Sequence, residues 1–306
     1  MNSLPRETQL QLVQSLVTGV SIRDTSRNCH VSRETIAKYI VDLGKLSGWY
    51  QDKVMRGLYC ERIEVDEIWG FVFSKDKTLR LGRAKNPPPD AGSVWTWIAI
   101  DPVTKLVPAW WIGNRTQEAG HLFLKDLHSR LASRVQLTSD GYSPYISAVE
   151  ATFGGNVDFA QLVKLYMDEN SDPATERLSN RAQYSGHRKD VIMGNPDPAL
   201  ITTAHVERLN LTLRMSVKRL TRSSNAHSKS ILYHAYHIAL FFMFYNFCRW
   251  HSSVGMTPAQ AAGLADRRWG VVDLVDMLNE YWKARRPHTY KPRKPSPRIR
   301  ERLSLN

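Results

Sequence analysis

The sequence predicts an α/β protein in which helices flank a mixed β-sheet, with a small helix-turn-helix domain at the N-terminus. Two observations support this fold class. Residues 6–46 carry apolar side chains at helical spacing, whereas residues 62–139 contain four stretches rich in β-branched and aromatic residues, separated by turns and one helical stretch. This order of elements is typical of a sheet covered by helices, and 306 residues suit about two domains.

Three short helices are expected within residues 6–46. The first carries apolar residues at helical spacing and ends near Gly19. Ser21 is a candidate N-cap for the second helix and Ser32 for the third, because a serine hydroxyl can accept a hydrogen bond from a backbone N–H of the first turn. A turn at 29–31 separates these two helices. The arrangement predicts the helix-turn-helix domain.

The third helix has two distinct faces. Its apolar residues form one stripe that we expect to be buried: Ile36, Tyr39, Ile40 and Leu43. Arg33, Thr35 and Lys38 lie outside this stripe near the helix start. In helix-turn-helix proteins the N-terminal residues of the last helix contact base edges in the major groove. These three residues are therefore candidate DNA contacts, although three small helices also occur in unrelated modules.

The elements and the basic segments define the expected domain organisation. The expected units are a helix-turn-helix domain at 1–46, a linker at 47–61, an α/β domain at 62–263 with an inserted loop at 168–200, a C-terminal helix at 264–283 and a basic, disordered tail at 284–306. The expected strands are 62–73, 94–100, 105–112 and 135–139, and an expected helix spans 116–132. The insertion is polar and contains glycines and prolines, which favour a loop or hairpin.

The charge balance indicates a polyanionic partner. The chain has 42 Lys+Arg against 29 Asp+Glu, a net charge of +13, and the blocks 203–230 and 283–306 together account for the whole surplus. A basic, proline-rich tail can bind phosphate without reading sequence, or it can serve only solubility. The three cysteines lie far apart, which argues against a disulfide scaffold or a cysteine-rich zinc site. The first residues contain no apolar stretch of signal-peptide length, so we expect a cytoplasmic protein.

One segment raises the alternative of a membrane partner. Residues 231–248 are strongly apolar, but His234, His237 and Asn246 interrupt them, and they fall short of the ~20 apolar residues that a span needs. A buried helix of a globular domain is the better interpretation. We therefore expect no membrane association, and the anionic partner is predicted to be nucleic acid.

Three acidic residues are candidates for a metal site. Asp66 falls within the first expected strand, Asp140 ends the fourth, and Glu207 lies in a helical run where Asn210 and Arg214 share its face. Clustered carboxylates repel one another unless a cation joins them. Mg²⁺ prefers oxygen ligands, and two such ions can assist an in-line phosphoryl displacement. The pattern is compatible with a two-metal phosphoryl-transfer site.

Each acid also has an ordinary structural interpretation. An Asp-Gly pair such as that at Asp140 is common in turns, and a lone Glu is common on a helix surface. Asp66 and Glu67 are adjacent, and successive strand residues point to opposite faces, so one of them is expected to be solvated or paired. Asp101 and Asp158 remain rival candidates.

Four motifs in order resemble those of the DDE transposases of short bacterial insertion sequences, the insertion-sequence-one type above all. The motifs are VDEIWGFV, TSDGY, HVERLNLTLR and YNFCRWHSSVGMTPAQAAG, within residues 62–263. The resemblance implies a ribonuclease-H-like fold, with Asp66, Asp140 and Glu207 as catalytic acids that bind two Mg²⁺ or Mn²⁺ ions. It also implies that Arg214 acts against DNA. The interval between Asp140 and Glu207 is longer than in compact integrases, and the cysteine-based zinc finger of the type member is missing.

The resulting functional hypothesis is a transposase that binds the terminal inverted repeats of its own element, cleaves DNA and transfers the freed 3′-hydroxyl to target DNA. The expected DNA-binding residues are Arg33, Thr35, Lys38, His205, Asn210, Arg214, Lys218 and Arg219. Double-stranded DNA is the expected partner, and joining two ends suggests a homodimer or larger assembly. A stand-alone nuclease of the same fold and a non-enzymatic DNA-binding regulator derived from a transposase are the alternatives. Tyr142 and Tyr145 as covalent nucleophiles are a weaker hypothesis.

Overall fold

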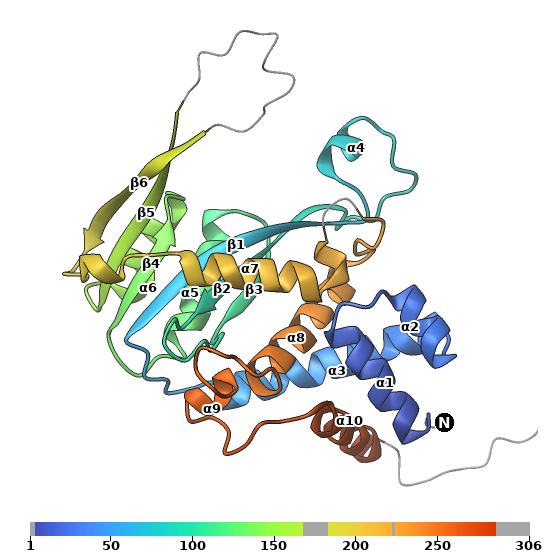
Figure 1. Ribbon diagram of the computed structural model, residues 1–306. Helices are drawn as coiled ribbons and strands as arrows, with labels where there is room; N and C mark the ends of the chain where they lie inside the picture. Colours follow the sequence, from blue (N-terminus) through green and yellow to red (C-terminus); the bar gives the residue numbers. More distant parts are fainter. Residues whose placement is uncertain (1–3, 168–182, 222–223, 286–306) are drawn as a thin grey trace, which may run out of the picture.

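A computed structural model describes residues 4–167, 183–221 and 224–285 (Figure 1). Six strands form one mixed sheet in the order β3-β2-β1-β4-β5-β6. Their bounds are β1 Arg62–Val72, β2 Gly92–Ile100, β3 Trp110–Gly113, β4 Val135–Asp140, β5 Val157–Met167 and β6 Gln183–Met193. β1 is antiparallel to β2 but parallel to β4, β4 is parallel to β5, and both edge strands are antiparallel to their neighbours. The predicted mixed sheet is therefore present.

Helices flank this sheet on both faces. The α-helices are α1 Arg6–Val17, α2 Ile22–Cys29, α3 Arg33–Val54, α4 Asp76–Arg80, α5 Gln117–His128, α6 Pro144–Phe153, α7 Ala204–Ser216, α8 Ile231–Phe247, α9 Pro258–Ala261 and α10 Val271–Arg285; the 3-10 turns are η1 Pro198–Leu200 and η2 Lys218–Leu220. This arrangement is compatible with a ribonuclease-H-like α/β fold.

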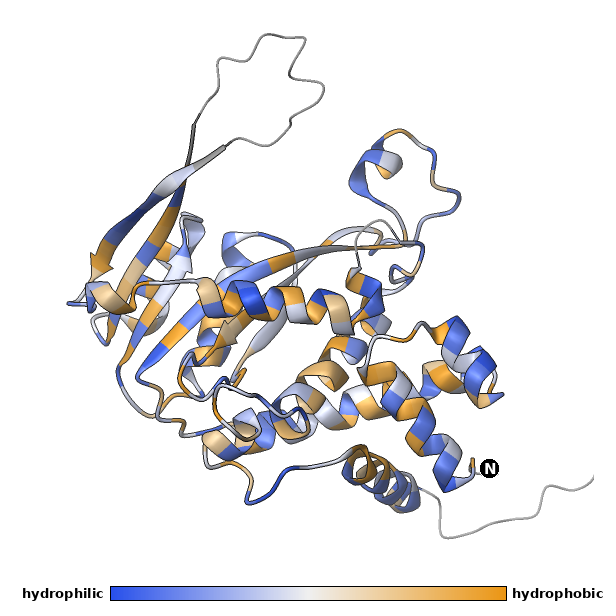
Figure 2. Ribbon diagram, in the orientation of Figure 1, coloured by the Kyte–Doolittle hydropathy of each residue, from blue (hydrophilic) through white to orange (hydrophobic). Residues whose placement is uncertain are grey.

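Alternating residues of the central strands fill two separate cores. Trp97 of β2 packs on the side of α5 and α6, where its ring centroid lies 6.1 Å from that of Phe123. Its neighbour Ile98 points the other way and packs with Val206 and Leu209 of α7. Most residues of α8 are buried, and α8 packs against α3. Figure 2 shows that much of α8 has hydrophobic colour. Burial on both faces is what makes these strands rich in apolar residues.

The N-terminal region contains the three expected helices with the expected caps. The hydroxyl of Ser21 accepts from the N–H of Asp24 at 3.1 Å, and that of Ser32 accepts from the N–H of Thr35 at 3.2 Å. The expected apolar stripe of α3 is buried throughout. His30 adopts a left-handed conformation with φ 53° and turns the chain between α2 and α3.

Helix α3 is longer than expected and removes most of the expected linker at 47–61. It continues to Val54, and Ser47 and Gln51 are buried against α8. The crossing is close at Gly44, where an added Cβ would lie 2.4 Å from the Cβ of Tyr236. The glycine therefore allows α3 and α8 to approach. As a result, the N-terminal helices share one core with the sheet domain.

The C-terminal helix α10 begins later than the expected 264–283 because a turn precedes it. The Asp273 carboxylate accepts from the N–H of Gly270 at 2.7 Å and pairs with Arg267 at 2.5 Å. α10 then packs against the N-terminal helices, and Arg6 pairs with Asp276 at 2.5 Å. In Figure 1 α10 lies beside α1. The expected basic tail, from residue 286 on, lies outside the described residues.

The expected insertion at 168–200 is partly regular structure. β6 extends the sheet beside β5 and ends at Met193, so the segment contributes an edge strand as well as a loop. Residues 168–182 lie outside the described part.

Among the helices that the structure describes, none combines the length and the apolar composition needed to cross a membrane.

Candidate active site

The parallel pairing of β1 with β4 sets Asp66 beside Asp140. Glu64 of β1 pairs with Thr138 of β4, and two residues further along this register are Asp66 and Asp140. Asp140 is the last residue of β4, where the chain turns toward α6, and its Oδ1 accepts from the N–H of Tyr142 at 3.0 Å. The carboxyl ends of parallel strands form the crevice where such sheets usually hold their chemistry. Asp140 therefore lies at the carboxyl end of β4, and Asp66 lies on the neighbouring strand β1.

Helix α7 is fastened along β1 by two acidic side chains of that strand. Glu64, 2% exposed, accepts from the backbone N–H groups of His205 and Val206 at 2.8 and 3.0 Å. It caps the N-terminus of α7 from another element, satisfying helix donors that Thr203 leaves unbonded. Further along the helix, Nδ2 of Asn210 donates to Oδ2 of Asp66 at 2.7 Å. The two contacts fix the position of α7 against the strand.

Glu207 lies one turn before Asn210 and is held toward the same edge. Its Oε1 accepts from the Thr203 hydroxyl at 2.7 Å and pairs with Nζ of Lys164 of β5, also at 2.7 Å. In this conformation a lysine from the neighbouring strand balances the charge of the helix acid. Lys164 was not anticipated from the sequence.

Electrostatics show that the three acids share one neighbourhood. Burial, reinforced by the charges of Asp140 and Glu67, raises the pKa of Asp66 to about 7, and Glu207 adds a smaller effect in the same direction. Asp66 is thus only partly ionised near neutrality, because burial and then the neighbouring negative charges disfavour its ionised form. A cation at this edge would relieve that repulsion.

Glu67 occupies the opposite face of β1 and is paired, as the strand alternation predicts. Its Oε1 accepts from Nε of Arg115 at 2.5 Å, and its Oε2 accepts from the Tyr145 hydroxyl at 3.0 Å. Arg115 also approaches Oδ2 of Asp140 at 3.9 Å and stacks over the Tyr142 ring at 3.9 Å. Burial and the Asp140 charge raise the pKa of Glu67, although Arg115 opposes this. Arg115 follows β3 and lies in none of the sequence motifs around the acids.

The oxygen donors fit a hard divalent cation in chemistry, because carboxylates are the ligands that Mg²⁺ and Mn²⁺ prefer. Among the residues that the structure describes, no group of three or more His, Cys, Asp or Glu side chains forms a ready metal site. Asp66, Asp140 and Glu207 instead engage Asn210, Arg115 and Lys164. Binding a metal would require these three acids to exchange present partners for the ion.

The rival acids have structural roles. Asp101 accepts from the N–H of Val103 at 2.8 Å and from the Thr104 hydroxyl at 2.6 Å, which closes the turn after β2. Asp158 pairs with Arg134 at 2.7 Å, and hydrogen bonding to this arginine holds the pKa of Asp158 below its usual value. Neither carboxylate belongs to the neighbourhood of Asp66.

The expected DNA contacts on and after α7 fall into two groups. The ring Nδ1 of His205 lies 2.7 Å from Glu64, and Arg214 donates to the carbonyls of Leu220 and Trp69 at 3.2 and 3.4 Å. The first group comprises His205, Asn210 and Arg214 of α7 and half-buried Lys218 of η2. The second group is one residue, Arg219.

Arg219 is half-buried, and its guanidinium bonds to an interior side chain. Its Nε donates to Nδ1 of His237 at 3.1 Å, and burial lowers the pKa of Arg219 to about 10. His237 in turn contacts the Leu16 carbonyl at 3.1 Å, so this arginine helps to join α8 to α1. The sequence did not reveal this, because a basic residue in a basic run resembles its exposed neighbours.

The N-terminal candidates are arranged differently. Arg33 and Lys38 are exposed on α3, and Lys38 Nζ lies 5.8 Å from the Trp282 ring centroid of α10. Thr35 is half-buried, and its Oγ1 lies 3.1 Å from the hydroxyl of Ser32. Two of the three residues therefore present charge to solvent at the start of the helix.

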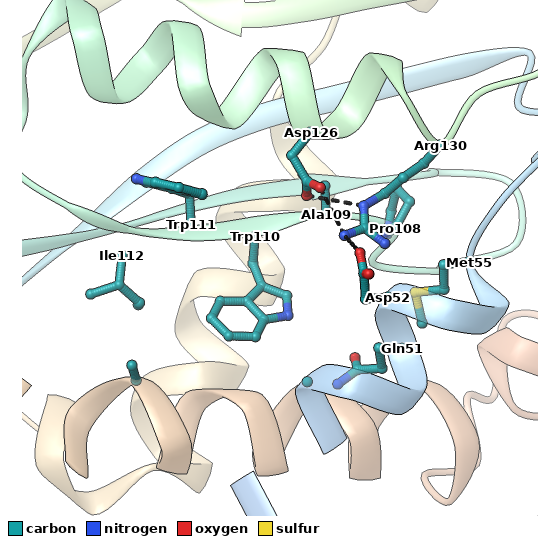
Figure 3. Close-up of a pocket in the computed structure, with 12 residues that line it drawn as sticks. Gln51, Asp52, Met55, Pro108, Ala109, Trp110, Trp111, Ile112, Asp126 and Arg130 are labelled. Atoms are coloured by element: carbon teal, nitrogen blue, oxygen red, sulfur yellow. Dashed lines mark hydrogen bonds and ion pairs between the residues drawn. The ribbon is translucent and has the colours of Figure 1, made fainter. Parts of the chain in front are cut away.

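A cavity of about 360 Å³ lies apart from the acids, between α3, α5 and β3 (Figure 3). Its walls include Trp110, Trp111 and Arg130, and Arg130 bonds to Asp126 and Asp52 across it. None of the three candidate acids lines this cavity. The chemistry suggested by the sequence therefore belongs to the strand edge rather than to the cavity.

Comparison with known proteins gives little beyond this geometry. No protein-family model and no curated protein match the chain. Among solved structures, the chain is similar to the piggyBac transposase in its synaptic complex with hairpin DNA, with a TM-score of 0.36 and 12% sequence identity. The likeness covers 100% of this chain and 78% of that one. A similarity at this level carries no argument about function.

Proposed function

We propose that this chain is a DNA transposase that cleaves DNA and transfers strands at the edge formed by β1, β4 and α7. The single observation that carries the proposal is the 2.7 Å hydrogen bond from Asn210 to Asp66, which holds the helix that carries Glu207 against the strand that carries Asp66. The charges of Asp140 and Glu207 add to the effect of burial in raising the pKa of Asp66. Asp66 and Asp140 lie on neighbouring strands, and Glu207 lies on the helix that Asn210 joins to Asp66. The order of motifs around them, described above, favours transposition over other phosphoryl transfers.

In this proposal Asp66, Asp140 and Glu207 hold two divalent cations, Mg²⁺ or Mn²⁺. Such ions, when bound, supply a nucleophile at neutral pH and offset charge on the attacking and leaving oxygens. The chain's own residues position these acids. Asn210 orients Asp66 through its 2.7 Å hydrogen bond, and Glu64 keeps the start of α7 against β1. Lys164 and Arg115 balance the acids' charge while no cation is bound.

DNA binding in this proposal uses surfaces on both sides of the acids. Arg33, Thr35 and Lys38 at the start of α3 contact the terminal inverted repeats. His205, Arg214 and Lys218 line the path of the reacting strand along α7. Arg219 is left out because its guanidinium is buried against His237. In this proposal water is the nucleophile of the first step and the freed 3′-hydroxyl that of the second, so neither Tyr142 nor Tyr145 is needed as a nucleophile. Tyr145 is buried and donates to Glu67.

The test uses charge-neutralising variants of near-identical shape. Asp66→Asn and Glu207→Gln should abolish Mg²⁺-dependent cleavage of element ends while end binding persists. Asp158→Asn is the matched control, because this acid lies in the same sheet but outside the site; its cleavage should stay within about twofold of wild type. Cleavage that survives in both site variants would refute the assignment.

Two further outcomes separate the alternatives. A pre-cleaved end with a free 3′-hydroxyl should be joined to target DNA; cleavage without joining would indicate a stand-alone nuclease. Sequence-specific binding with no cleavage at any metal concentration would indicate a regulator. In the complex that joins two ends, we expect at least two copies of the chain.

A further inference from the structure

A basic arm extends from the sheet between β1 and β2. We call residues 74–91 the arm; it includes the short helix α4, and Figure 1 shows it projecting away from the sheet. It contains five Lys and Arg residues but only two acids, Asp76 and Asp90. Most of α4 has hydrophilic colour in Figure 2.

Both acids of the arm are used to fasten it. Asp76 accepts from the N–H of Ser93 at 2.8 Å and from the hydroxyl of Ser93 at 2.5 Å. Asp90 accepts from the N–H of Ile231 at 2.9 Å, which caps the start of α8. Neither acid pairs with a cation of the arm. The two attachments hold the arm at its base and leave its positive charge uncompensated.

The cations of the arm face solvent. Lys77, Arg80, Arg83 and Lys85 are exposed, and none forms an ion pair with any residue in the described ranges. Arginine and lysine on a fastened loop lose little additional freedom when they bind an anion. The arrangement suits phosphate oxygens, which arginine can contact through two parallel N–H groups.

The base of the arm adjoins the basic block that follows α7. The N–H of Phe73 donates to the Ser228 carbonyl at 2.7 Å, and the ring of His227 contacts the Phe73 carbonyl at 2.9 Å. Lys229, which is exposed, lies 5.8 Å from the Phe73 ring centroid. Lys229 therefore adds an exposed positive charge at the base of the arm.

The arm starts a defined distance from the acids. β1 continues from Asp66 to Val72, which is about 20 Å at roughly 3.3 Å per residue. Base pairs in B-DNA are spaced by roughly 3.4 Å, so this distance corresponds to about six base pairs. A duplex that reacts at Asp66 and runs in the direction of β1 would reach the base of the arm within one helical turn.

We propose that the arm binds the phosphate backbone of double-stranded DNA about six base pairs from the reacting phosphodiester. This inference rests on the proposed function for the position of the reacting phosphate. The contacts are to phosphate, so the arm adds affinity and register without reading base sequence. It thereby extends the DNA-binding surface beyond the N-terminal helices and α7.

The first test measures the salt dependence of DNA binding by the full chain. In Arg80→Gln/Arg83→Gln, the slope of log affinity against log salt should become shallower by about 1.8, since each lost phosphate contact contributes about 0.9. The matched control is Lys53→Gln/Lys125→Gln, which removes two exposed cations from α3 and α5 and should leave the slope unchanged. Equal slopes for the arm variant and wild type would overturn the inference.

The second test locates the contact. Duplexes are shortened on one side of the cleavage position at a time. When the side that the arm contacts has fewer than about six base pairs, wild type and the arm variant should bind the duplex with equal affinity. Longer duplexes should bind wild type more tightly. A difference that persists on the shortest duplexes on both sides would contradict the position.

The outcomes separate failure of the inference from failure of the proposed function. If Asp66→Asn and Glu207→Gln both still cleave, the proposed function fails, whereas an unchanged slope in the arm variant overturns only the arm. Vesicles containing anionic lipid serve as a competing polyanion. Loss of vesicle binding in the arm variant, with unchanged DNA binding, would assign the arm to a membrane surface and overturn the inference.

Discussion

Asn210 of α7 donates a 2.7 Å hydrogen bond to the carboxylate of Asp66 on β1. The bond joins the helix that carries Glu207 to the strand that carries the first acid. Glu64, two residues before Asp66, holds the start of the same helix. The relative positions of the acids therefore depend on side chains that need not touch substrate.

We expect Asn210→Ala to lower the cleavage rate by about 10–100-fold, the usual effect of removing a partner that orients a metal ligand. End binding should change little. Asn225→Ala, an exposed asparagine after η2, is the control and should retain wild-type cleavage. If the rate and the metal concentration needed for half-maximal cleavage were both unchanged in Asn210→Ala, the hydrogen bond would have no positioning role.

The raised pKa of Asp66 predicts a pH-dependent stability effect when metal is removed with a chelator. In the folded state this carboxyl titrates near 7, against about 3.8 for its ordinary value, so folding binds a proton within that window. The free energy of unfolding of wild type should therefore fall as pH rises from about 4 to 7. The Asp66→Asn variant has no carboxyl that ionises at this position, so its free energy of unfolding should not fall for this reason.

Denaturant titrations at pH 5 and pH 8 check this expectation. The stability of Asp66→Asn relative to wild type should increase between the two pH values, on the order of 2 kcal/mol. Asp158→Asn, whose parent carboxyl has a lowered pKa, should show no such increase. A relative stability of Asp66→Asn that is equal at both pH values would contradict the electrostatic coupling of the acids.

Two buried histidines predict loss of stability in acid. Burial, followed by the charge of Arg219, lowers the pKa of both His234 and His237 to about 3. Between about pH 6.5 and 3 the unfolded chain binds protons that the folded chain excludes. The free energy of unfolding should therefore fall with pH in this window, by about 1.4 kcal/mol per pH unit for each histidine.

Replacing one histidine tests this assignment. His237→Gln should reduce the slope of unfolding free energy against pH by about 1.4 kcal/mol per pH unit, because one of the two histidine contributions is lost. His187→Gln, at an exposed position of β6, is the control and should leave the slope unchanged. An identical slope in His237→Gln and wild type would show that another group causes the acid sensitivity.

Arg130 supports the junction of α5 with α3, and its loss should destabilise the fold. Its side chain is 8% exposed and contacts Asp126 at 2.8 Å and Asp52 at 3.0 Å. Arg130→Met leaves Asp126 without its partner and should cost about 3 kcal/mol in the free energy of unfolding. Arg56→Met, an exposed arginine that also pairs with Asp52, should cost under about 1 kcal/mol. Equal costs for the two variants in denaturant titrations would refute this account.

The regular elements were largely predictable because local patterns determine them. The caps at Ser21 and Ser32 and the buried stripe of α3 follow from spacing and residue type. Three of the four expected strands appear close to their expected bounds, whereas 105–112 is regular only from Trp110. The extent of α3 was not predictable, since its last turns are stabilised by distant contacts with α8.

The candidate site was predictable in part. The acids could be named from motifs, and strand alternation predicted that one of Asp66 and Glu67 would be solvated or paired; Glu67 is paired with Arg115. The residues that contact the acids or hold α7, namely Arg115, Lys164 and Glu64, were not predicted, because each contacts a residue far away in the sequence. Arg219 shows the converse, since only the tertiary structure distinguishes a buried cation from a solvent-exposed one.

The central claim is that Asp66, Asp140 and Glu207 together bind divalent metal. Calorimetric titration of Mn²⁺ into the chain bound to a DNA duplex tests it most directly. We expect about two ions per chain for wild type and for Asp158→Asn, and a loss of at least one ion in both Asp66→Asn and Glu207→Gln. Unaltered stoichiometry and affinity in both site variants would contradict the account.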